Sequence, residues 1–178
     1  MTLGEELRAI ADLLARRELD GETEALVAAH LDAVRTAVGA IAPAARLDHD
    51  RVGPLRGIDN VVAPPLLFGD PVVRDGVIVT NAVARFGDRY EGPPGLVHGG
   101  IVAAGFDEVL AVAQRDAGVG GMTREISVRF RQPVRLDAVV VYTAWVEQDD
   151  GRRAMVRGAA HVDDELCADA AAEFARPR

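Results

Sequence analysis

The chain has 178 residues, of which 49% are hydrophobic, so it can form one domain with a substantial core and a small extension. Its formal net charge of -8 argues against nucleic acid or an anionic membrane as a partner, because both attract concentrated positive charge. All 20 basic residues are arginine, which excludes lysine Schiff-base chemistry and the lysine-containing GxxxxGK[ST] phosphate loop.

Few side chains remain as candidate nucleophiles. The only serine, Ser127, lies in a strand-like segment without a GxSxG motif, and the only cysteine, Cys167, lies in an alternating segment. One cysteine cannot form an internal disulfide, and no segment has the length and apolarity of a signal h-region or a membrane-spanning helix. These features predict a soluble cytoplasmic protein. No metal or other cofactor is expected.

The first part of the chain, residues 1–42, predicts a helical hairpin. Residues 2–18 have apolar side chains at helical spacing behind a possible capping box of Thr2 and Glu5. Residues 23–41 repeat the pattern and end before Pro43. We expect this hairpin to extend a main domain.

Residues 43–75 are rich in Pro, Gly and Asp and predict a connector with short extended pieces. The main domain then occupies residues 76–178. It begins with an alternating strand at 76–87 and continues with a helix after a Gly-Pro loop. Further strand-like runs follow at 121–132, 137–148, 152–162 and 165–175. This order predicts an α+β domain in which an antiparallel sheet wraps round one buried central helix.

The start of that helix, in GLVHGGIVAAGFDEVL (residues 95–110), combines two glycines with a nearby acidic pair. Gly99 and Gly100 would present backbone N–H groups where a helix lacks internal acceptors, and a ligand could approach them closely. An oxyanion hole requires this geometry, although Gly-Gly is also common in tight turns.

Asp107 follows Gly99 by eight residues, which places it about 12 Å further along the helix axis. One chain cannot bring the two together at one reacting atom. If they share a site, a second copy of the chain must supply one of them. The alternative is that Asp107 and Glu108 are exposed or paired with an arginine.

VHGGIVAAGFDEVLA together with residues 122–174 resembles the PaaI-type acyl-CoA thioesterases, which have the hotdog fold. The resemblance rests on HGG followed by Asp at this spacing, and on a later strand that begins with Thr and ends in an aromatic-x-x-Pro pattern. It covers about residues 76–175 and implies a homodimer or homotetramer that hydrolyses acyl-CoA, with active sites at the subunit interface.

By this resemblance, Asp107 would be the nucleophile or general base, and the Gly99 N–H of the other subunit would polarise the thioester carbonyl. Thr123 would orient the attacking water. His98 and Gly100 of the motif would contact the substrate, with His98 as an orienting group. Relatives can have an asparagine about six residues before the histidine, where this chain has Glu91-Gly92.

Two further expectations concern substrate binding and packing. Arg129 and Arg131 share one face of their strand and could hold the phosphates of coenzyme A, or form surface ion pairs. Trp145 and Phe130 are expected to pack the sheet against the helix. His30, His49 and His161 lack metal-like spacing and are expected to be structural.

Alternatives remain on the same fold. Glu108 is a rival acid, and a non-catalytic acyl-CoA sensor would use the same cleft without turnover. A hydratase is weakened because no Asp-x-x-x-x-His pair lies near an extended loop.

Overall fold

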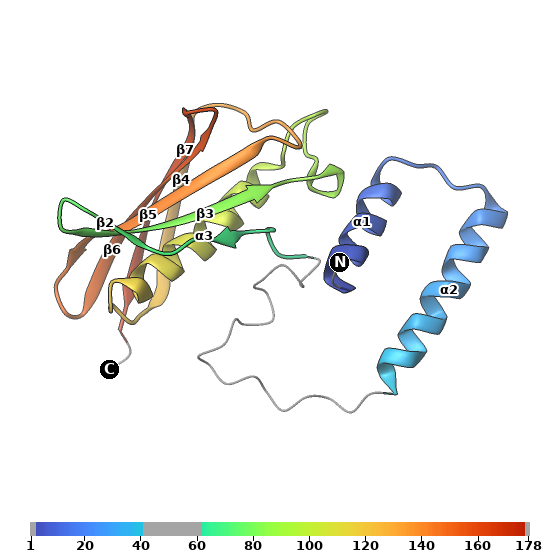
Figure 1. The fold of residues 1–178 in the computed structure, drawn as a ribbon, viewed down its shortest axis with the longest axis horizontal. Helices are drawn as coiled ribbons and strands as arrows, with labels where there is room; N and C mark the ends of the chain where they lie inside the picture. The colour runs from blue at the N-terminus through green and yellow to red at the C-terminus, as the bar shows by residue number, and fades with distance from the viewer. Residues whose placement is uncertain (1–2, 41–61, 177–178) are drawn as a thin grey trace.

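The computed structural model describes residues 3–40 and 62–176 (Figure 1). The elements in chain order are α1 (Leu3–Ala15), α2 (Gly21–Gly39), β1 (Leu67–Phe68), β2 (Val72–Arg74), β3 (Val77–Arg85), the 3-10 turn η1 (Asp88–Tyr90), α3 (Gly99–Asp116), β4 (Met122–Phe130), β5 (Val139–Asp149), β6 (Arg153–Val162) and β7 (Glu165–Ala175). The predicted α+β class is confirmed, with each expected strand and helix of the main domain present.

The strands form one antiparallel sheet in the order β1-β3-β5-β6-β7-β4, and β2 also pairs with β3. The chain leaves β3, passes through α3 and returns as β4 at the opposite edge, next to β7. Strands β5, β6 and β7 follow as consecutive antiparallel neighbours and lie between β3 and β4 in the sheet. Figure 1 shows α3 lying along one face of the curved sheet, as a hotdog fold requires.

The core lies between α3 and this inner face of the sheet. Strand β7 shows the pattern clearly, because Ala170, Ala172 and Phe174 are buried while the residues between them are half-buried. On α3, Phe106 packs edge-on against Tyr142 of β5, with ring centroids 5.2 Å apart. Burial raises the pKa of the Tyr142 phenol above its ordinary value, so this ring stays neutral.

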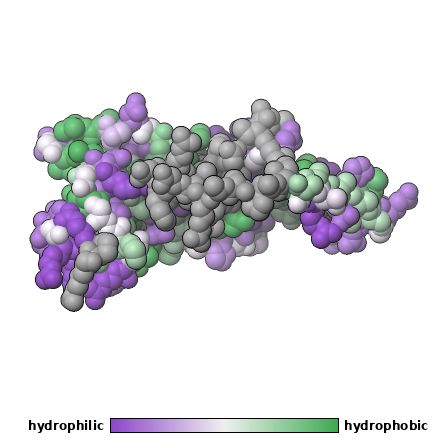
Figure 2. Space-filling view, turned by 90° about the horizontal axis from the view of Figure 1, so that it is seen from below, coloured by the Kyte–Doolittle hydropathy of each residue, from purple (hydrophilic) through white to green (hydrophobic). Residues whose placement is uncertain are grey.

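The N-terminal helices form where the apolar spacing predicts them, but they differ in their contacts. Helix α1 lies against η1 through buried polar side chains. Helix α2 buries none of its residues. In the space-filling view, the end of the molecule that α2 occupies in Figure 1 carries hydrophobic and hydrophilic patches side by side (Figure 2).

The expectation that Trp145 packs against α3 is wrong. On β5 the buried residues are Val140, Tyr142 and Ala144, and Trp145 lies half-buried on the opposite, outer face of the sheet. The expected Thr2 cap, His49 and most of the 43–75 connector lie outside the described residues. None of the described helices is long and apolar enough to cross a bilayer.

Candidate active site

The N-terminus of α3 is capped by the residue that precedes it. The His98 backbone is extended, and its Nδ1 accepts a hydrogen bond of 3.0 Å from the Gly100 N–H. An acceptor role for Nδ1 places the proton of the neutral ring on Nε2. The cap occupies the Gly100 N–H, so the Gly99 N–H is the helix-start donor next to the cavity described below.

Close packing around His98 explains why two positions of this segment are occupied by glycine. A Cβ on Gly92 would lie 2.8 Å from the His98 Cα, and a Cβ on Gly100 would lie 3.0 Å from His98 Nδ1. The position where relatives can have asparagine is therefore used for packing. The neighbouring Glu91 side chain accepts a 2.6 Å hydrogen bond from the Gly95 N–H, which stabilises the loop before α3.

Tyr90 connects this loop to the N-terminal helix. Its backbone carbonyl accepts a 2.8 Å hydrogen bond from the His98 N–H. Its phenol oxygen donates to the Ala63 carbonyl at 2.8 Å and accepts a 2.7 Å hydrogen bond from Arg8 of α1, which is only 6% exposed. Asp12 of α1 pairs with Arg89 at 2.7 Å. The residue before Gly99 is thus held by contacts that reach α1.

Asp107 lies on the exposed side of α3 and meets the start of β4. The Thr123 hydroxyl lies 3.4 Å from Asp107 Oδ1, a long hydrogen bond. A β-bulge between Thr123 and Glu125 changes the register with β7, and Thr123 stands opposite the buried Phe174 on the helix side of the sheet. Glu108, the rival acid, is half-buried.

The edge strand β4 leaves apolar side chains exposed beside Asp107. Met122 is 71% exposed and Phe130 is 54% exposed, and Ile126 between them is also exposed. On the nearby part of α3, Ala103 and Ala104 are only half-buried. An unpaired strand edge with an apolar strip is the kind of surface that pairs with another chain.

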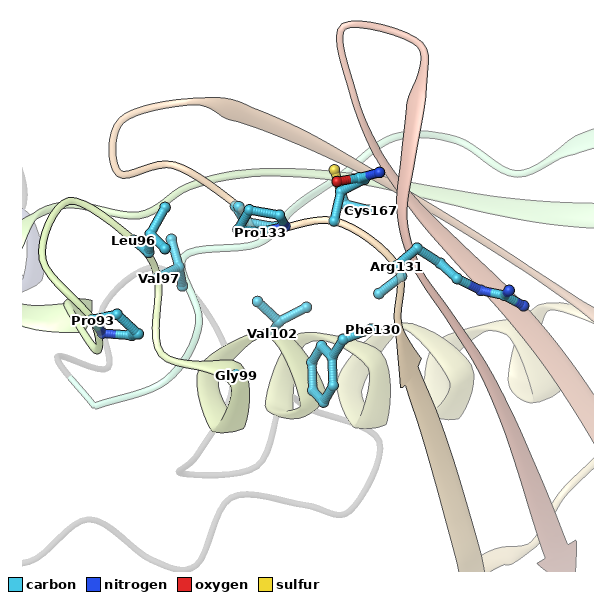
Figure 3. A pocket seen from close by; sticks show the side chains of 12 residues that line it. Pro93, Leu96, Val97, Gly99, Val102, Phe130, Arg131, Pro133 and Cys167 are labelled. Carbon is cyan, nitrogen blue, oxygen red and sulfur yellow. The ribbon is translucent and has the colours of Figure 1, made fainter.

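An apolar cavity of about 290 Å³ opens beside Gly99 (Figure 3). Its walls come from the loop before α3, the first turns of α3, the end of β4 and the start of β7. The lining residues are Pro93, Leu96, Val97, Gly99, Val102, Phe130, Arg131, Gln132, Pro133, Val134, Cys167 and Ala168. The Phe130 ring would lie 3.4 Å from a Cβ on Gly99, so it stands directly over the helix start.

The two arginines expected to bind phosphates lie on the outer face of the sheet. Arg129 lines a shallow hollow of about 140 Å³ with Ser127, Arg157 and Asp169. Arg131 forms a 2.6 Å ion pair with Asp169, which lowers the pKa of that carboxyl. Figure 3 shows the Arg131 guanidinium pointing away from the other labelled lining side chains. The structure therefore does not bring these guanidinium groups to Gly99.

The remaining candidate side chains do not form a second centre. In residues 3–40 and 62–176, no group of three His, Cys, Asp or Glu side chains could hold a metal ion. His30 Nδ1 lies 2.8 Å from the Leu26 carbonyl, and His161 is half-buried on β6. Cys167 is buried, and desolvation raises the pKa of its thiol, which disfavours the reactive thiolate.

Sequence reasoning missed two parts of this arrangement. The cavity depends on the loop at 93–97 meeting the segment at 130–134, and no local pattern signals that contact. The contact between Arg8 and Tyr90 joins residues 82 positions apart. The sequence signal for it is the spacing of Arg8, Asp12 and Arg16 along α1 and just after its end, which is also typical of a solvated helix face.

Comparison with known sequences identifies relatives of the main domain. Residues 94–169 match the model of the thioesterase superfamily. Human acyl-coenzyme A thioesterase THEM5 is 32% identical over 79 residues, which are 44% of this chain and 32% of that protein. Acyl-coenzyme A thioesterase THEM4 of Xenopus laevis is 32% identical over 90 residues, which are 49% of this chain and 40% of that protein. The chain thus spans less than half the length of these relatives.

Solved structures extend the similarity to the whole fold. A crystal structure of a thioesterase superfamily protein superposes with a TM-score of 0.83 at 27% identity and covers 96% of this chain and 92% of its own. The E. coli PaaI protein superposes with a TM-score of 0.54 at 15% identity over 60% of this chain and 82% of its own, which supports the fold alone. In its sequence over residues 94–169 and in its hotdog architecture, the main domain is similar to proteins of the thioesterase superfamily.

Proposed function

We propose that this protein hydrolyses acyl-CoA thioesters to the free acid and CoA, at active sites shared by two copies of the chain. The observation that carries the proposal is the position of Asp107, beside the Thr123 hydroxyl of β4, which pairs only with β7 within residues 3–40 and 62–176 and so forms an edge of the sheet. Gly99 lies about 12 Å back along the same helix. Relatives named as acyl-CoA thioesterases supply the reaction class.

The exposed edge supports a two-fold dimer. If β4 pairs with the β4 of a second copy, the two sheets become continuous and the partner can cover the exposed side chains of Ile126 and Phe130 on the helix side of β4. The α3 helices of the two copies then lie next to each other. In an antiparallel arrangement, Asp107 of one copy approaches Gly99 of the other, and two equivalent sites result.

The chemistry requires one base and one oxyanion donor. Asp107 takes a proton from a water molecule held by Thr123, and the water oxygen attacks the thioester carbonyl carbon. The negative charge moves to the carbonyl oxygen, where the Gly99 N–H and the positive end of α3 stabilise it. The C–S bond then breaks, and the thiolate receives the proton from Asp107. In the alternative route Asp107 attacks first, and water hydrolyses the resulting anhydride.

The first experiment measures thiol release from acyl-CoAs of increasing length, with the wild type and Asp107→Asn. We expect turnover by the wild type and a loss of at least about 100-fold in kcat in the variant, the usual range for a positioned acid or base. If the wild type binds acyl-CoA but releases no thiol at any length, the protein is a sensor. A single turnover in ¹⁸O-water tests the anhydride route, because ¹⁸O enters Asp107 when water attacks the aspartyl carbonyl of the anhydride, whereas the general-base route leaves Asp107 unlabelled.

A second experiment tests whether the sites are shared. Gly99→Pro removes the N–H at the first helical position, where proline is well tolerated and where the extended His98 backbone suits it. Gly99→Ala retains the N–H and is the matched control. Mixing inactive Asp107→Asn with inactive Gly99→Pro creates one intact site in each mixed dimer, so about a quarter of wild-type activity should return. No recovery after verified subunit exchange would refute the shared site.

If coenzyme A binds here, its phosphates need cations. Arg129 and Arg131 remain our candidates on the outer face of β4, although Arg131 is paired with Asp169. Neutralising either one should raise KM and leave kcat unchanged, because the phosphates are remote from the reacting carbonyl.

A further inference from the structure

Helix α1 reaches the start of α3 through the loop that contains Tyr90. We propose that α1 acts as a brace that sets the position of the Gly99 N–H, and that Arg8 and Tyr90 are positioning residues for the reaction. This inference rests on the proposed function and adds two residues that act on the oxyanion donor through His98. The contacts that carry it run from α1 to Tyr90 and from Tyr90 to His98.

The Gly99 N–H takes its direction from His98. The two residues share one planar peptide group, so a movement of the His98 carbonyl turns the Gly99 N–H with it. His98 is fixed by its own N–H, which donates a 2.8 Å hydrogen bond to the Tyr90 carbonyl. Beside this bond, Glu91 and Val97 form an antiparallel bridge. A displacement of Tyr90 is therefore passed to the first turn of α3.

Tyr90 is in turn held by α1. It is 4% exposed, and its phenol hydroxyl donates to the Ala63 carbonyl at 2.8 Å. One nitrogen of Arg8, Nη1, donates both to the phenol oxygen at 2.7 Å and to the Ala63 carbonyl at 3.1 Å. These bonds are buried and directional, and a buried donor left unpaired is costly, so they fix Tyr90 to α1 more narrowly than apolar packing would.

A second contact keeps α1 from sliding along the loop. Asp12, one turn after Arg8, accepts hydrogen bonds from the Arg89 side chain at 2.7 Å and from the Arg89 backbone N–H at 3.1 Å. The Arg8 carbonyl accepts a third from the Arg89 guanidinium at 2.8 Å. The approach is so close that a Cβ on Gly87 would lie 2.9 Å from the Asp12 carboxylate. Helix α1 thus has one defined position against this loop.

The alternative is that α1 merely pads the core. Its apolar side chains argue against this, because Ile10, Leu13 and Leu14 are exposed. Arg8, a charged residue of the same helix, is by contrast only 6% exposed. Helix α1 therefore contributes directed hydrogen bonds more than apolar burial, which suits a brace.

The first test observes Gly99 directly and is independent of turnover. In protein labelled with ¹⁵N-glycine, Arg8→Met and Tyr90→Phe should each shift the amide resonances of Gly99 and Gly100, because both amides depend on the preceding loop. Arg35→Met makes the same substitution on α2, where the side chain is 82% exposed, and should leave both resonances in place. If neither Arg8→Met nor Tyr90→Phe moves them in folded protein, α1 does not position the start of α3 and the inference fails.

The second test asks whether that position matters for the reaction. At a temperature where every variant is folded, Arg8→Met and Tyr90→Phe should each lower kcat by about tenfold and leave KM within about twofold, because a misplaced donor stabilises the transition state less. The double variant should lose little more than either single one, since both break the same link. A double variant whose loss is the product of the two single losses would contradict a shared link.

Partial rescue separates positioning from general damage. In Arg8→Lys the ammonium group has three donors and can replace the single nitrogen that serves Tyr90 and Ala63, so part of the kcat lost in Arg8→Met should return. Arg35→Met should have the kcat of the wild type. Equal kcat in Arg8→Lys and Arg8→Met would show that the hydrogen bonds of Arg8 do not position Gly99.

If both resonances shift and the wild type hydrolyses no thioester, the brace stands and the proposed reaction fails. If thioesters are hydrolysed but kcat is unchanged in Arg8→Met and Tyr90→Phe, the enzyme is confirmed and this inference fails. Should Tyr90→Phe not fold, Arg8→Met and Arg8→Lys still decide the question.

Discussion

The Thr123 hydroxyl of β4 lies 3.4 Å from Asp107 Oδ1 of α3, which links the start of the edge strand to the middle of the central helix. If this hydroxyl positions water, Thr123→Val should lower kcat by about tenfold or more with little change in KM, because only the reacting water is affected. Thr123→Ser keeps the hydroxyl and should retain most activity. Steady-state kinetics of both variants measure this. A Thr123→Val enzyme with wild-type kcat would show that the hydroxyl has no part in the reaction.

The buried contact between Arg8 and Tyr90 should stabilise the fold. Tyr90→Phe removes an acceptor from a guanidinium that is 6% exposed, and we expect a loss of about 1–3 kcal/mol in the free energy of unfolding. Arg16→Gln breaks an exposed ion pair with Asp88 and should cost less than about 1 kcal/mol. Denaturant titration compares the two. Equal, small effects would mean that α1 contributes little to stability.

The close approach of Gly92 to His98 predicts a local effect on activity. In Gly92→Ala the new Cβ would lie 2.8 Å from a backbone atom, so the His98 segment must shift. Because His98 caps α3, the Gly99 N–H would move with it, and kcat should fall about tenfold or more. Gly69→Ala, where a Cβ meets nothing within 4 Å, is the control. Unchanged kcat in Gly92→Ala would show that the cap does not set the position of the Gly99 N–H, the proposed oxyanion donor.

The pair of Arg131 and Asp169 predicts a pH-dependent contribution to stability. The hydrogen bond from Arg131 lowers the Asp169 pKa below its ordinary 3.8, so the unfolded chain binds the proton more tightly than the folded one. The pair therefore stabilises the fold above about pH 4 and loses this effect as the pH falls further.

The effect should be small because the two side chains are 43% and 39% exposed, and solvent screening limits such pairs to about 0.5 kcal/mol. Asp169→Asn should lower Tm slightly at pH 7, and the difference from the wild type should shrink as the pH falls below about 4. Differential scanning fluorimetry measures both Tm values across this pH range. A Tm difference that stays constant would show that the stabilisation does not come from the charge of Asp169.

The sequence predicts the strands and the central helix well because alternation and a long apolar run are local signals. It predicts less well which face of β5 is buried. The run Val139, Val140, Val141, Tyr142 is apolar at every position, so the pattern does not tell inside from outside, and Trp145 was placed on the wrong side. Here tertiary packing decides between two local alternatives.

The residues of the candidate site could likewise be predicted only in part. The HGG motif and the acid at its spacing could be found from the sequence, because both lie on one helix. The meeting of Asp107 with Thr123 agrees with the resemblance, but its distance required the structure. The cavity depends on segments that are distant in the chain, so its lining could not be predicted.

Helix α2 has 19 residues, and none of them is buried. Its helical state therefore depends on local interactions, such as the hydrogen bond of 2.7 Å that the Thr23 N–H donates to the Asp20 carboxylate. In proteins most of the stability of a helix comes from tertiary packing, and α2 has little of it. In deuterated solvent, the amides of α2 should therefore exchange orders of magnitude faster than those in the buried middle of α3, which open mainly when the whole domain unfolds. Slow exchange throughout α2 would reveal that another surface covers this helix in solution.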